Sequence, residues 1–393
     1  MEFAKVIKEV VGLGRTSFGI IKFEIAYQWT YLNYTWESAQ QYNRAIESGR
    51  YVPANNAPTG LKFYGNLMFI SVPRFRPGIP ATLVSLEITH QTINPLLSPY
   101  PNWQFNNDHS SCKHLQSVQS MEVDTSGTMW IIDGVRINNY NRCPAKLVLL
   151  NLNQAGSLVH LYEFPERLSS RNGGFLNDIV LDETDGGFAY ITENGQLDPG
   201  IIVYSRRKNQ AWKLRDVSML PEPNAVVFRV EDVVFDAPTP IDGIALSPSK
   251  TLFYCAISSY SMYSIETSII KNRVLVKSGI WKRNITFVGT KSAQSDGIII
   301  DNKSNMYLTM LPQHAVAMWN INEPIASIIR LDQDRQRMVW PDGFAFDQRG
   351  FLYLISNKIY NYIDLRRTPV VTDEVQFRVL RLFTGTTSYL NSK

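Results

Sequence analysis

A two-strand pattern recurs six times along the 393-residue chain, and it restricts the fold more than any other feature. Each copy has a polar residue at its start, a run of alternating apolar character, a polar or glycine-containing turn and a second strand rich in aromatic residues or methionine. The copies begin at Thr59, Gln119, Asn177, Asp242, Asp296 and Asp342, and the copy at Thr59 is the weakest. They lie about 46 to 65 residues apart, which suits a four-stranded blade with its loops. The pattern therefore predicts an all-β fold, a six-bladed β-propeller.

In a propeller the first strand of each blade lines the axial channel and the second strand runs back beside it. Residues just before the first strand and just after the second therefore emerge on one face. We expect a ring of candidate ligand-binding residues at this mouth, formed by Thr59, Gln119, Asn177, Asp242, Asp296 and Asp342, with Asp133, Glu193 and Asn357 behind it.

Two interpretations of this polar ring stay open. In the first, the Asp-Gly pairs are turn residues and the ring only hydrates a water-filled channel. In the second, the ring is functional, because three carboxylates in a narrow funnel raise one another's pKa unless a cation, a water network or a cationic ligand compensates.

A propeller also needs its first and last blades joined, because otherwise two sheet edges stay unpaired. The segment FEIAYQWTYL, residues 23–32, is typical of a strand, and FRVLRLF at 377–383 is typical of another. We predict that these two pair, so that an N-terminal strand closes the ring. The expected domain organisation is a propeller over 23–385, an atypical and poorly ordered segment 1–22 with no evident signal peptide, and a C-terminal tail 386–393.

Charge and motif content exclude several function classes. The chain has 39 Lys and Arg against 35 Asp and Glu, and no basic stripe with interleaved aromatic residues, so no nucleic-acid partner is expected. No apolar run reaches the roughly 20 residues that span a bilayer, so no membrane partner is expected either. No P-loop, H-E-x-x-H or G-x-S-x-G motif occurs, and no cofactor is expected.

The three cysteines allow more than one arrangement. Cys112 and Cys143 flank one hairpin and can be bridged in an oxidising compartment, which leaves Cys255 free. His109, Cys112 and His114 have the spacing of metal ligands, but no second paired motif completes a zinc site, so no metal is expected there. An alternative is a calcium ion held by oxygens of Asn177, Asp242 and their neighbours. Three N-glycosylation sequons lie at Asn33, Asn284 and Asn302.

Several segments, in this order, resemble the Yellow and major royal jelly proteins of insects. They include YQWTYLNYTW, LQSVQSMEVDTSGTMWIIDGVR, CPAKLVLLNL, SSYSMYSIET and WPDGFAFDQRGFLYLISNKI, and the similarity runs from about Phe23 to Leu380. The resemblance implies a secreted six-bladed propeller in which Cys112 and Cys143 are bridged. It also implies one of several roles: cuticle pigmentation, conversion of dopachrome-like aminochromes, binding of biogenic amines in the central channel, or nutrition.

The expected function combines the resemblance with the acidic mouth. Asp242, Asp296 and Asp342 would meet an ammonium group, and nearby aromatic side chains a catechol or indole ring. A small aromatic amine or an aminochrome is therefore the expected ligand. Carboxyl groups in a shielded pocket can also tautomerise an aminochrome, since this needs only a base and an acid. The alternative is a non-catalytic structural or nutritive secreted protein; the sequence indicates no oligomeric state.

Overall fold

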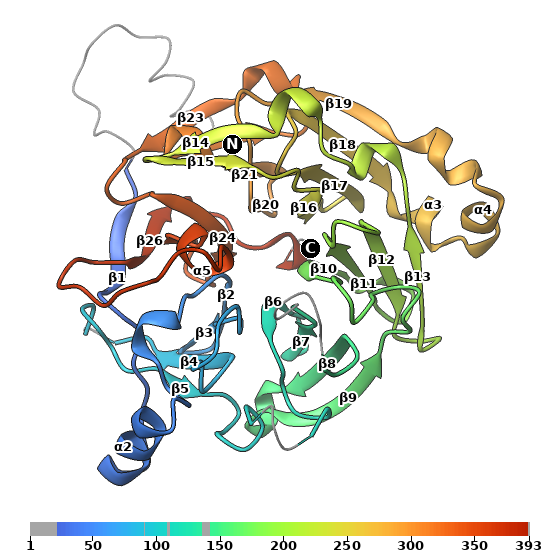
Figure 1. The fold of residues 1–393 in the computed structure, drawn as a ribbon. Helices are drawn as coiled ribbons and strands as arrows, with labels where there is room; N and C mark the ends of the chain where they lie inside the picture. Colours follow the sequence, from blue (N-terminus) through green and yellow to red (C-terminus); the bar gives the residue numbers. More distant parts are fainter. Residues whose placement is uncertain (1–21, 90, 108–110, 136–141, 392–393) are drawn as a thin grey trace, which may run out of the picture.

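Six four-stranded antiparallel sheets form a ring around an axial channel in the computed structural model (Figure 1). The structure describes residues 22–89, 91–107, 111–135 and 142–391. This arrangement confirms the predicted six-bladed β-propeller. The segment 1–22, expected to be poorly ordered, lies outside the described residues except for Lys22.

Each blade consists of four strands that follow one another from the channel outward. In blades 1 to 3 these are β2 (Leu61–Tyr64), β3 (Leu67–Ser71), β4 (Leu83–Glu87), β5 (Ser98–Pro99); β6 (Val118–Val123), β7 (Thr128–Asp133), β8 (Lys146–Asn151), β9 (Ser157–Glu163); and β10 (Leu176–Asp182), β11 (Phe188–Glu193), β12 (Gly200–Ser205), β13 (Gln210–Leu214). In blades 4 to 6 they are β16 (Ile241–Leu246), β17 (Thr251–Ala256), β18 (Ser261–Glu266), β19 (Thr286–Thr290); β20 (Ile298–Ile300), β21 (Asn305–Met310), β22 (Ala315–Asn320), β23 (Ile329–Gln333); and β24 (Trp340–Phe346), β25 (Phe351–Asn357), β26 (Phe377–Phe383), β1 (Glu24–Trp29).

Blade 6 closes the ring because it contains both ends of the propeller. Strand β1 pairs antiparallel with β26, with Glu24 opposite Arg381 and Trp29 opposite Phe377. The backbone N–H of Phe23 also donates to Asp332 of blade 5 at 2.8 Å. The predicted pairing of residues 23–32 with 377–383 is therefore confirmed.

The core lies between neighbouring blades, where alternate strand residues of one sheet meet those of the next. Trp130 of blade 2 contacts Tyr204 of blade 3, and Phe63 of blade 1 contacts Tyr353 of blade 6, with ring centroids 6.3 and 4.4 Å apart. Trp130 and Tyr353 are both buried. These aromatic side chains belong to the inter-blade core, as the strand spacing predicts.

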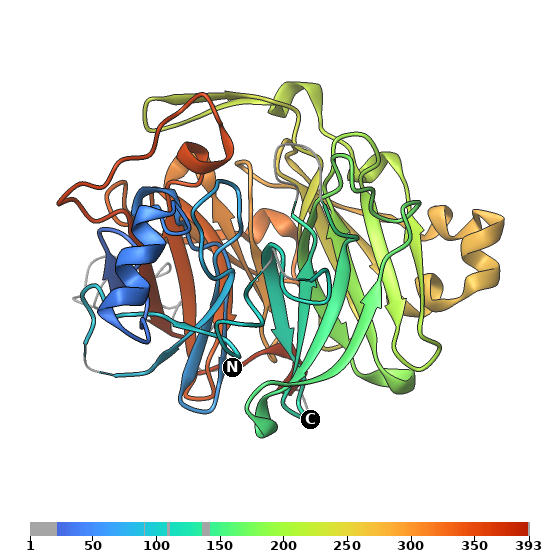
Figure 2. The ribbon, with the colours of Figure 1, turned by 60° about the horizontal axis from the view of Figure 1, so that its bottom comes forward.

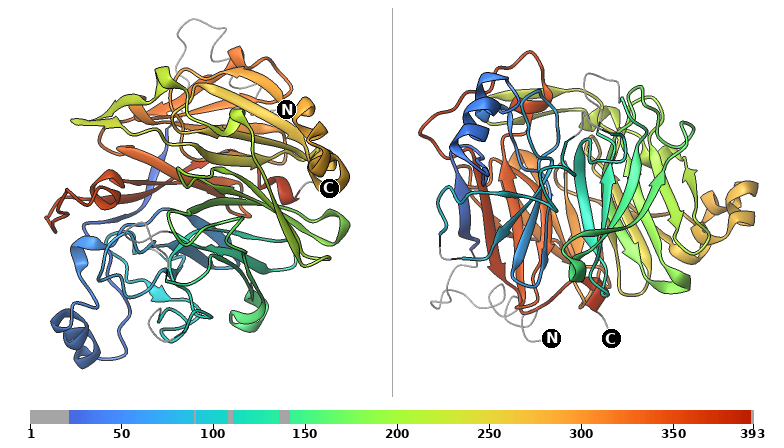
Figure 3. Two further views of the ribbon diagram at one scale, coloured as in Figure 1. Left: turned by 45° about the vertical axis from the view of Figure 1, so that its right-hand side comes forward. Right: turned by 90° about the horizontal axis from the view of Figure 1, so that it is seen from below.

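The two ends of the channel carry different additions. On the face where the innermost strands begin lie the hairpin β14 (Val227–Val230)–β15 (Val233–Asp236) and the short helix α5 (Tyr360–Ile363). On the opposite face the C-terminal segment reaches the channel axis (Figures 2 and 3). Residues 386–391, expected to be part of a tail, pack against the ring: Ser388 bridges Asp301 and Tyr389 is buried.

The remaining helices are short and lie in loops between strands. They are α2 (Ala39–Glu47), α3 (Thr267–Lys271), α4 (Arg273–Ser278) and the 3₁₀ helices η1 (Pro53–Asn55), η2 (Leu152–Gln154), η3 (Thr184–Gly186), η4 (Val217–Met219), η5 (Pro223–Ala225), η6 (Ile280–Asn284), η7 (Leu311–Gln313), η8 (Ile325–Ser327) and η9 (Tyr389–Asn391). Helix α2 begins after Ser38, whose side chain accepts a hydrogen bond from the backbone N–H of Gln41.

Candidate functional site

The axial channel contains a cavity of about 50 Å³ between its mouth and Tyr389. All six residues predicted to form the ring line it: Thr59, Gln119, Asn177, Asp242, Asp296 and Asp342. The structure thus brings these six residues together, each from a different blade. We refer to this space below as the axial cavity.

The Asp-Gly pairs of blades 4 to 6 reflect the narrowness of the channel. Asp242–Gly243 and Asp342–Gly343 lie inside β16 and β24, not in turns. A Cβ atom at Gly297 would lie 2.2 Å from the backbone oxygen of Asp342, and one at Gly243 would lie 2.5 Å from that of Asp296. Only glycine allows so close an approach of neighbouring strands. The interpretation as turn residues is therefore wrong for Asp242–Gly243 and Asp342–Gly343, whereas Asp296–Gly297 directly precedes β20.

Three of the ring residues form a network of carboxyl groups. The carboxyl groups of Asp242 and Asp296 lie close enough for each to shift the pKa of the other. Asp296 also accepts a hydrogen bond from the indole N–H of Trp340 at 2.7 Å, and Asp242 accepts one from Asn194 at 2.9 Å. Two neighbouring carboxyl groups repel each other when both are ionised, whereas one proton can bridge them, so the pair favours a state with one proton.

Burial raises the pKa of all three carboxyl groups above their ordinary value. For Asp242 and Asp342 the rise is large, and the nearby charge of Asp296 adds to the effect of burial. For Asp296 burial also raises the pKa, but the hydrogen bonds from Asp242 and Trp340 stabilise its ionised form and oppose the rise. Of the two, Asp242 is therefore the group that is more easily protonated.

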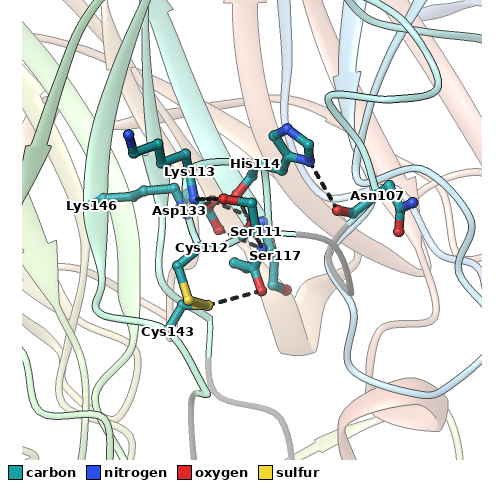
Figure 4. Close-up of a disulfide and its surroundings, with 10 residues drawn as sticks. Asn107, Ser111, Cys112, Lys113, His114, Ser117, Asp133, Cys143 and Lys146 are labelled. Atoms are coloured by element: carbon teal, nitrogen blue, oxygen red, sulfur yellow. Dashed lines mark hydrogen bonds and ion pairs between the residues drawn. A yellow bond between two sulfur atoms is a disulfide. The ribbon is translucent and has the colours of Figure 1, made fainter.

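The three residues predicted behind the ring have separate surroundings. Asn357 contacts the ring directly, because its side-chain amide donates to Asp342 at 2.7 Å. Glu193 is buried against the ammonium group of Lys213 and accepts a hydrogen bond from the backbone N–H of Phe175. Asp133 forms an ion pair with Lys146 at 2.6 Å, with both side chains fully buried (Figure 4). Asp133 and Glu193 thus do not line the axial cavity.

We expect the ion pair of Asp133 and Lys146 to stabilise the fold. Lys146→Met leaves a buried carboxylate without its cation, which costs about 3–5 kcal/mol. Urea unfolding should show this loss as a lower midpoint. The double variant Lys146→Met/Asp133→Asn removes both charges and keeps one side-chain oxygen, which can accept from the backbone N–H of either Gln116 or Ser117 but not from both. It should lose clearly less stability; an equal loss would contradict a role of the charge.

Sequence reasoning missed a second tier of polar residues in the same cavity. Lys62 of β2 forms an ion pair with Glu122 of β6 at 3.1 Å. Asp178 of β10 accepts a hydrogen bond from the hydroxyl of Ser120 at 2.9 Å, and burial raises the pKa of Asp178 to about 6. A signal was present in the aligned copies: Asp178 occupies a position that is glycine in four copies, and Lys62 and Glu122 replace small or apolar residues.

Aromatic side chains cover the mouth above the carboxyl network. Phe235 of β15 contacts Trp340 and Tyr360, with ring centroids 5.0 and 5.9 Å apart. The hydroxyl of Tyr360 donates to Glu231 at the tip of the hairpin at 2.5 Å. The β14–β15 hairpin is thereby fixed above Trp340, the residue that hydrogen-bonds Asp296.

The cysteine pair predicted from the resemblance is confirmed. Cys112 and Cys143 form a disulfide with Cα atoms 5.4 Å apart (Figure 4), and Cys255 is buried and free. Cys112 is therefore not available as the metal ligand considered beside His114, and His109 lies outside the described residues. Within the described ranges no group of three or more His, Cys, Asp or Glu side chains is arranged to hold a metal ion.

The sequence was compared with those of known protein families, and the result agrees with the six-bladed propeller described above. The sequence profile of the family described as "Major royal jelly protein" matches residues 116–386. The chain belongs to the major royal jelly protein family. The resemblance of the sequence to Yellow and major royal jelly proteins is thus confirmed.

Two relatives of this major royal jelly protein illustrate its similarity to characterised members. It is 24% identical to "Dopaminechrome tautomerase" of Drosophila melanogaster, over 88% of this chain and 81% of that protein. It is 26% identical to "Protein yellow" of Drosophila guanche, over 86% of this chain but only 62% of that protein. Among solved structures, a luciferin-regenerating enzyme matches with a TM-score of 0.51 and 12% identity, covering 84% of this chain and 92% of its own. That last likeness concerns the fold alone.

The predicted glycosylation sites differ in exposure. Asn284 is exposed, whereas Asn33 and Asn302 are half-buried. The side-chain oxygen of Asn33 accepts hydrogen bonds from the N–H of Tyr34 and the indole of Trp36. Among the residues that the structure describes, no helix is both long and apolar enough to cross a membrane.

Proposed function

We propose that this major royal jelly protein binds a small aromatic amine or an aminochrome at the mouth of its channel and tautomerises the aminochrome. The observation that carries the proposal is the pair of buried, neighbouring carboxyl groups of Asp242 and Asp296 in the axial cavity, of which Asp242 has the more strongly raised pKa. Two carboxyl groups with different environments can divide the roles of acid and base between them. The relative named dopaminechrome tautomerase supports this choice of reaction.

The reaction moves protons and needs no oxidant or reductant. The ionised Asp296 removes a proton from a ring carbon of the aminochrome, and the electron pair of that C–H bond moves into the ring system. The protonated Asp242 gives its proton to a quinone oxygen, which yields a quinone methide of the same composition; a second transfer of this kind, from the neighbouring ring carbon to the other oxygen, yields the dihydroxyindole. Asp342, beside them, faces the ring nitrogen, and the partial positive charge of that nitrogen favours the ionised form of Asp342.

Binding requires the mouth to open. A cavity of about 50 Å³ holds a few water molecules, whereas small-molecule sites measure about 300–1,000 Å³. The aromatic residues above Asp296 form a cover that a planar ring can displace and then stack against. We therefore propose that the β14–β15 hairpin moves aside when the ligand enters.

The charges of the cavity lead to a prediction about substrates. Glu122, Asp178, Asp242, Asp296 and Asp342 line it together with a single lysine, Lys62. We expect an aminochrome without a carboxylate, such as dopaminechrome, to lose its visible absorbance faster than dopachrome, by about tenfold in kcat/KM. Heat-inactivated protein is the control. Equal rates would refute the electrostatic argument, and no rate above the control would refute the enzymatic proposal.

A non-catalytic secreted protein is the second candidate function, and the small volume of the axial cavity favours it. Calorimetric titration with dopamine, serotonin and octopamine separates the two candidates. Micromolar binding that is lost in Asp342→Asn supports an amine site, whereas no heat of binding supports a structural or nutritive role. The disulfide and the family also support the proposal that the protein is secreted.

A further inference from the structure

A second, larger cleft lies on the same face, between β14 and loops of blades 4 and 5. It measures about 450 Å³ and is lined by Phe228, Arg229, Tyr260, Gln294, His314 and Arg335, among others. We call it the hairpin cleft. None of the axial carboxyl groups lines it, and its volume lies in the range of small-molecule sites.

The imidazole of His314 is held in one tautomer. Its Nδ1 lies 3.0 Å from the backbone oxygen of Val339 and 3.3 Å from that of Met338. A carbonyl oxygen only accepts hydrogen bonds, so Nδ1 carries the proton and Nε2 carries the lone pair. His314 thus offers the cleft a hydrogen-bond acceptor that suits a phenolic hydroxyl group.

The cleft is also positively charged. Arg229 and Arg335 are exposed on its rim. Within the described part of the chain, their guanidinium groups form no ion pair or hydrogen bond. Lys291, which precedes the lining residues 292–294 in the chain, is buried; its ammonium group has no hydrogen-bond partner in the described structure, and its charge acts on Glu222. The one acidic residue of the lining, Glu231, already accepts a hydrogen bond from Tyr360. An anionic ligand would therefore be attracted.

Two further residues give the cleft the surface for a flat ring. Phe228 and Tyr260 supply aromatic area, and the side-chain amide of Gln294 is fixed because it donates to the backbone oxygen of Ala225 at 2.9 Å. We propose that the hairpin cleft is a second ligand site, which binds a planar phenol that carries an anionic group such as a carboxylate. This inference uses no residue of the axial cavity, although β14 forms part of the cleft wall and belongs to the hairpin that is proposed to move.

Calorimetry with matched ligands tests the inference on the full chain. The probes are 3,4-dihydroxyphenylacetate, phenylacetate and dopamine, which share a ring but differ in hydroxyl groups and charge. We expect 3,4-dihydroxyphenylacetate to bind the unaltered protein, and its Kd to rise about tenfold in Arg229→Gln/Arg335→Gln. Phenylacetate should bind about tenfold more weakly, because it cannot donate to His314. Both arginines are exposed, so the double variant should fold normally; its melting temperature checks this.

Asp342→Asn is the control for the axial cavity and should leave the binding of 3,4-dihydroxyphenylacetate unchanged. The inference is overturned if the unaltered protein shows no binding at millimolar concentration, if the arginine variant binds equally well, or if Asp342→Asn abolishes binding. Dopamine titrates the axial cavity separately. A failure to bind dopamine would therefore count against the proposed function and not against the hairpin cleft.

Discussion

Deletion of residues 1–35 is expected to give insoluble protein. The deletion removes β1 and leaves β26 as an open edge with a row of unpaired backbone groups. It also removes the fully buried side chains of Phe23, Trp29 and Tyr34. Each large buried aromatic residue stabilises a fold by about 3–5 kcal/mol, and a whole domain is stable by only about 5–15 kcal/mol. The soluble fraction after expression and the thermal unfolding transition measure the effect.

A variant that begins at Lys22 is the matched control, because it keeps every residue of β1. It should unfold cooperatively at the melting temperature of the full chain. A soluble and cooperatively folding product of the longer deletion would show that the hydrogen bonds between β1 and β26 are not needed to close the ring.

Asp296→Asn and Asp242→Asn are each expected to lower the rate of aminochrome tautomerisation by about 10²–10⁴-fold. Asparagine keeps the size of the side chain and a hydrogen-bonding partner for Trp340 or Asn194, but it can neither accept nor release the proton. Stopped-flow absorbance measures the rate. Asp185→Asn, a change of an exposed carboxyl group at η3, is the control and should retain full activity.

The pH dependence follows from the raised pKa values of the pair. Activity should fall at low pH, as Asp296 becomes protonated, and at high pH, as Asp242 loses its proton; the two apparent pKa values belong to the pair. Both limbs should lie above the ordinary range of an aspartate. A profile that stays flat from pH 4 to 9 would contradict the assignment.

The same pKa shifts predict that the Asn variants are at least as stable as the unaltered protein at pH 7.5. Because the folded state raises these pKa values, it binds the protons more tightly than the unfolded chain does. The stabilisation from the carboxyl groups is present below their unfolded pKa and is lost as the pH rises through the folded pKa. At pH 7.5 the Asn variants should therefore melt at the same or a higher temperature. Inactive variants that are also less stable would point to a structural role for the pair.

The residues of the polar ring could be predicted because they occupy equivalent positions in the six copies of the repeat. Residues that differ from the other copies were not predicted to belong to the site. Strands that line the channel share one pattern, so the places of Asp242, Asp296 and Asp342 follow from alignment of the copies. The ion pair of Lys62 with Glu122 occurs only between blades 1 and 2 and has no counterpart in the other copies. This ion pair forms because blades 1 and 2 are neighbours in the ring, and the sequence of one copy does not show which blade lies beside it.

The β14–β15 hairpin and the position of Tyr389 also depend on tertiary contacts. The hairpin lies in the longest interval between copies, from Asn177 to Asp242, and that length was a usable signal for an insertion. Nothing in the repeat indicates that the C-terminal segment enters the channel. A segment of this length is fixed by the surface it meets, because it has too few residues to form a stable element alone.

The buried side chain of Tyr389 lines the axial cavity on the side of the C-terminal segment, opposite the mouth (Figure 2). Its hydroxyl accepts a hydrogen bond from the backbone N–H of Leu181 and donates one to the oxygen of the same residue, at 2.8 and 3.0 Å. We therefore expect water and solutes to reach the axial carboxyl groups from the opposite side, beneath the β14–β15 hairpin. A ligand would then leave by the route through which it entered, and substrate and product could not pass each other. A product that dissociates slowly would therefore inhibit binding of the next substrate competitively.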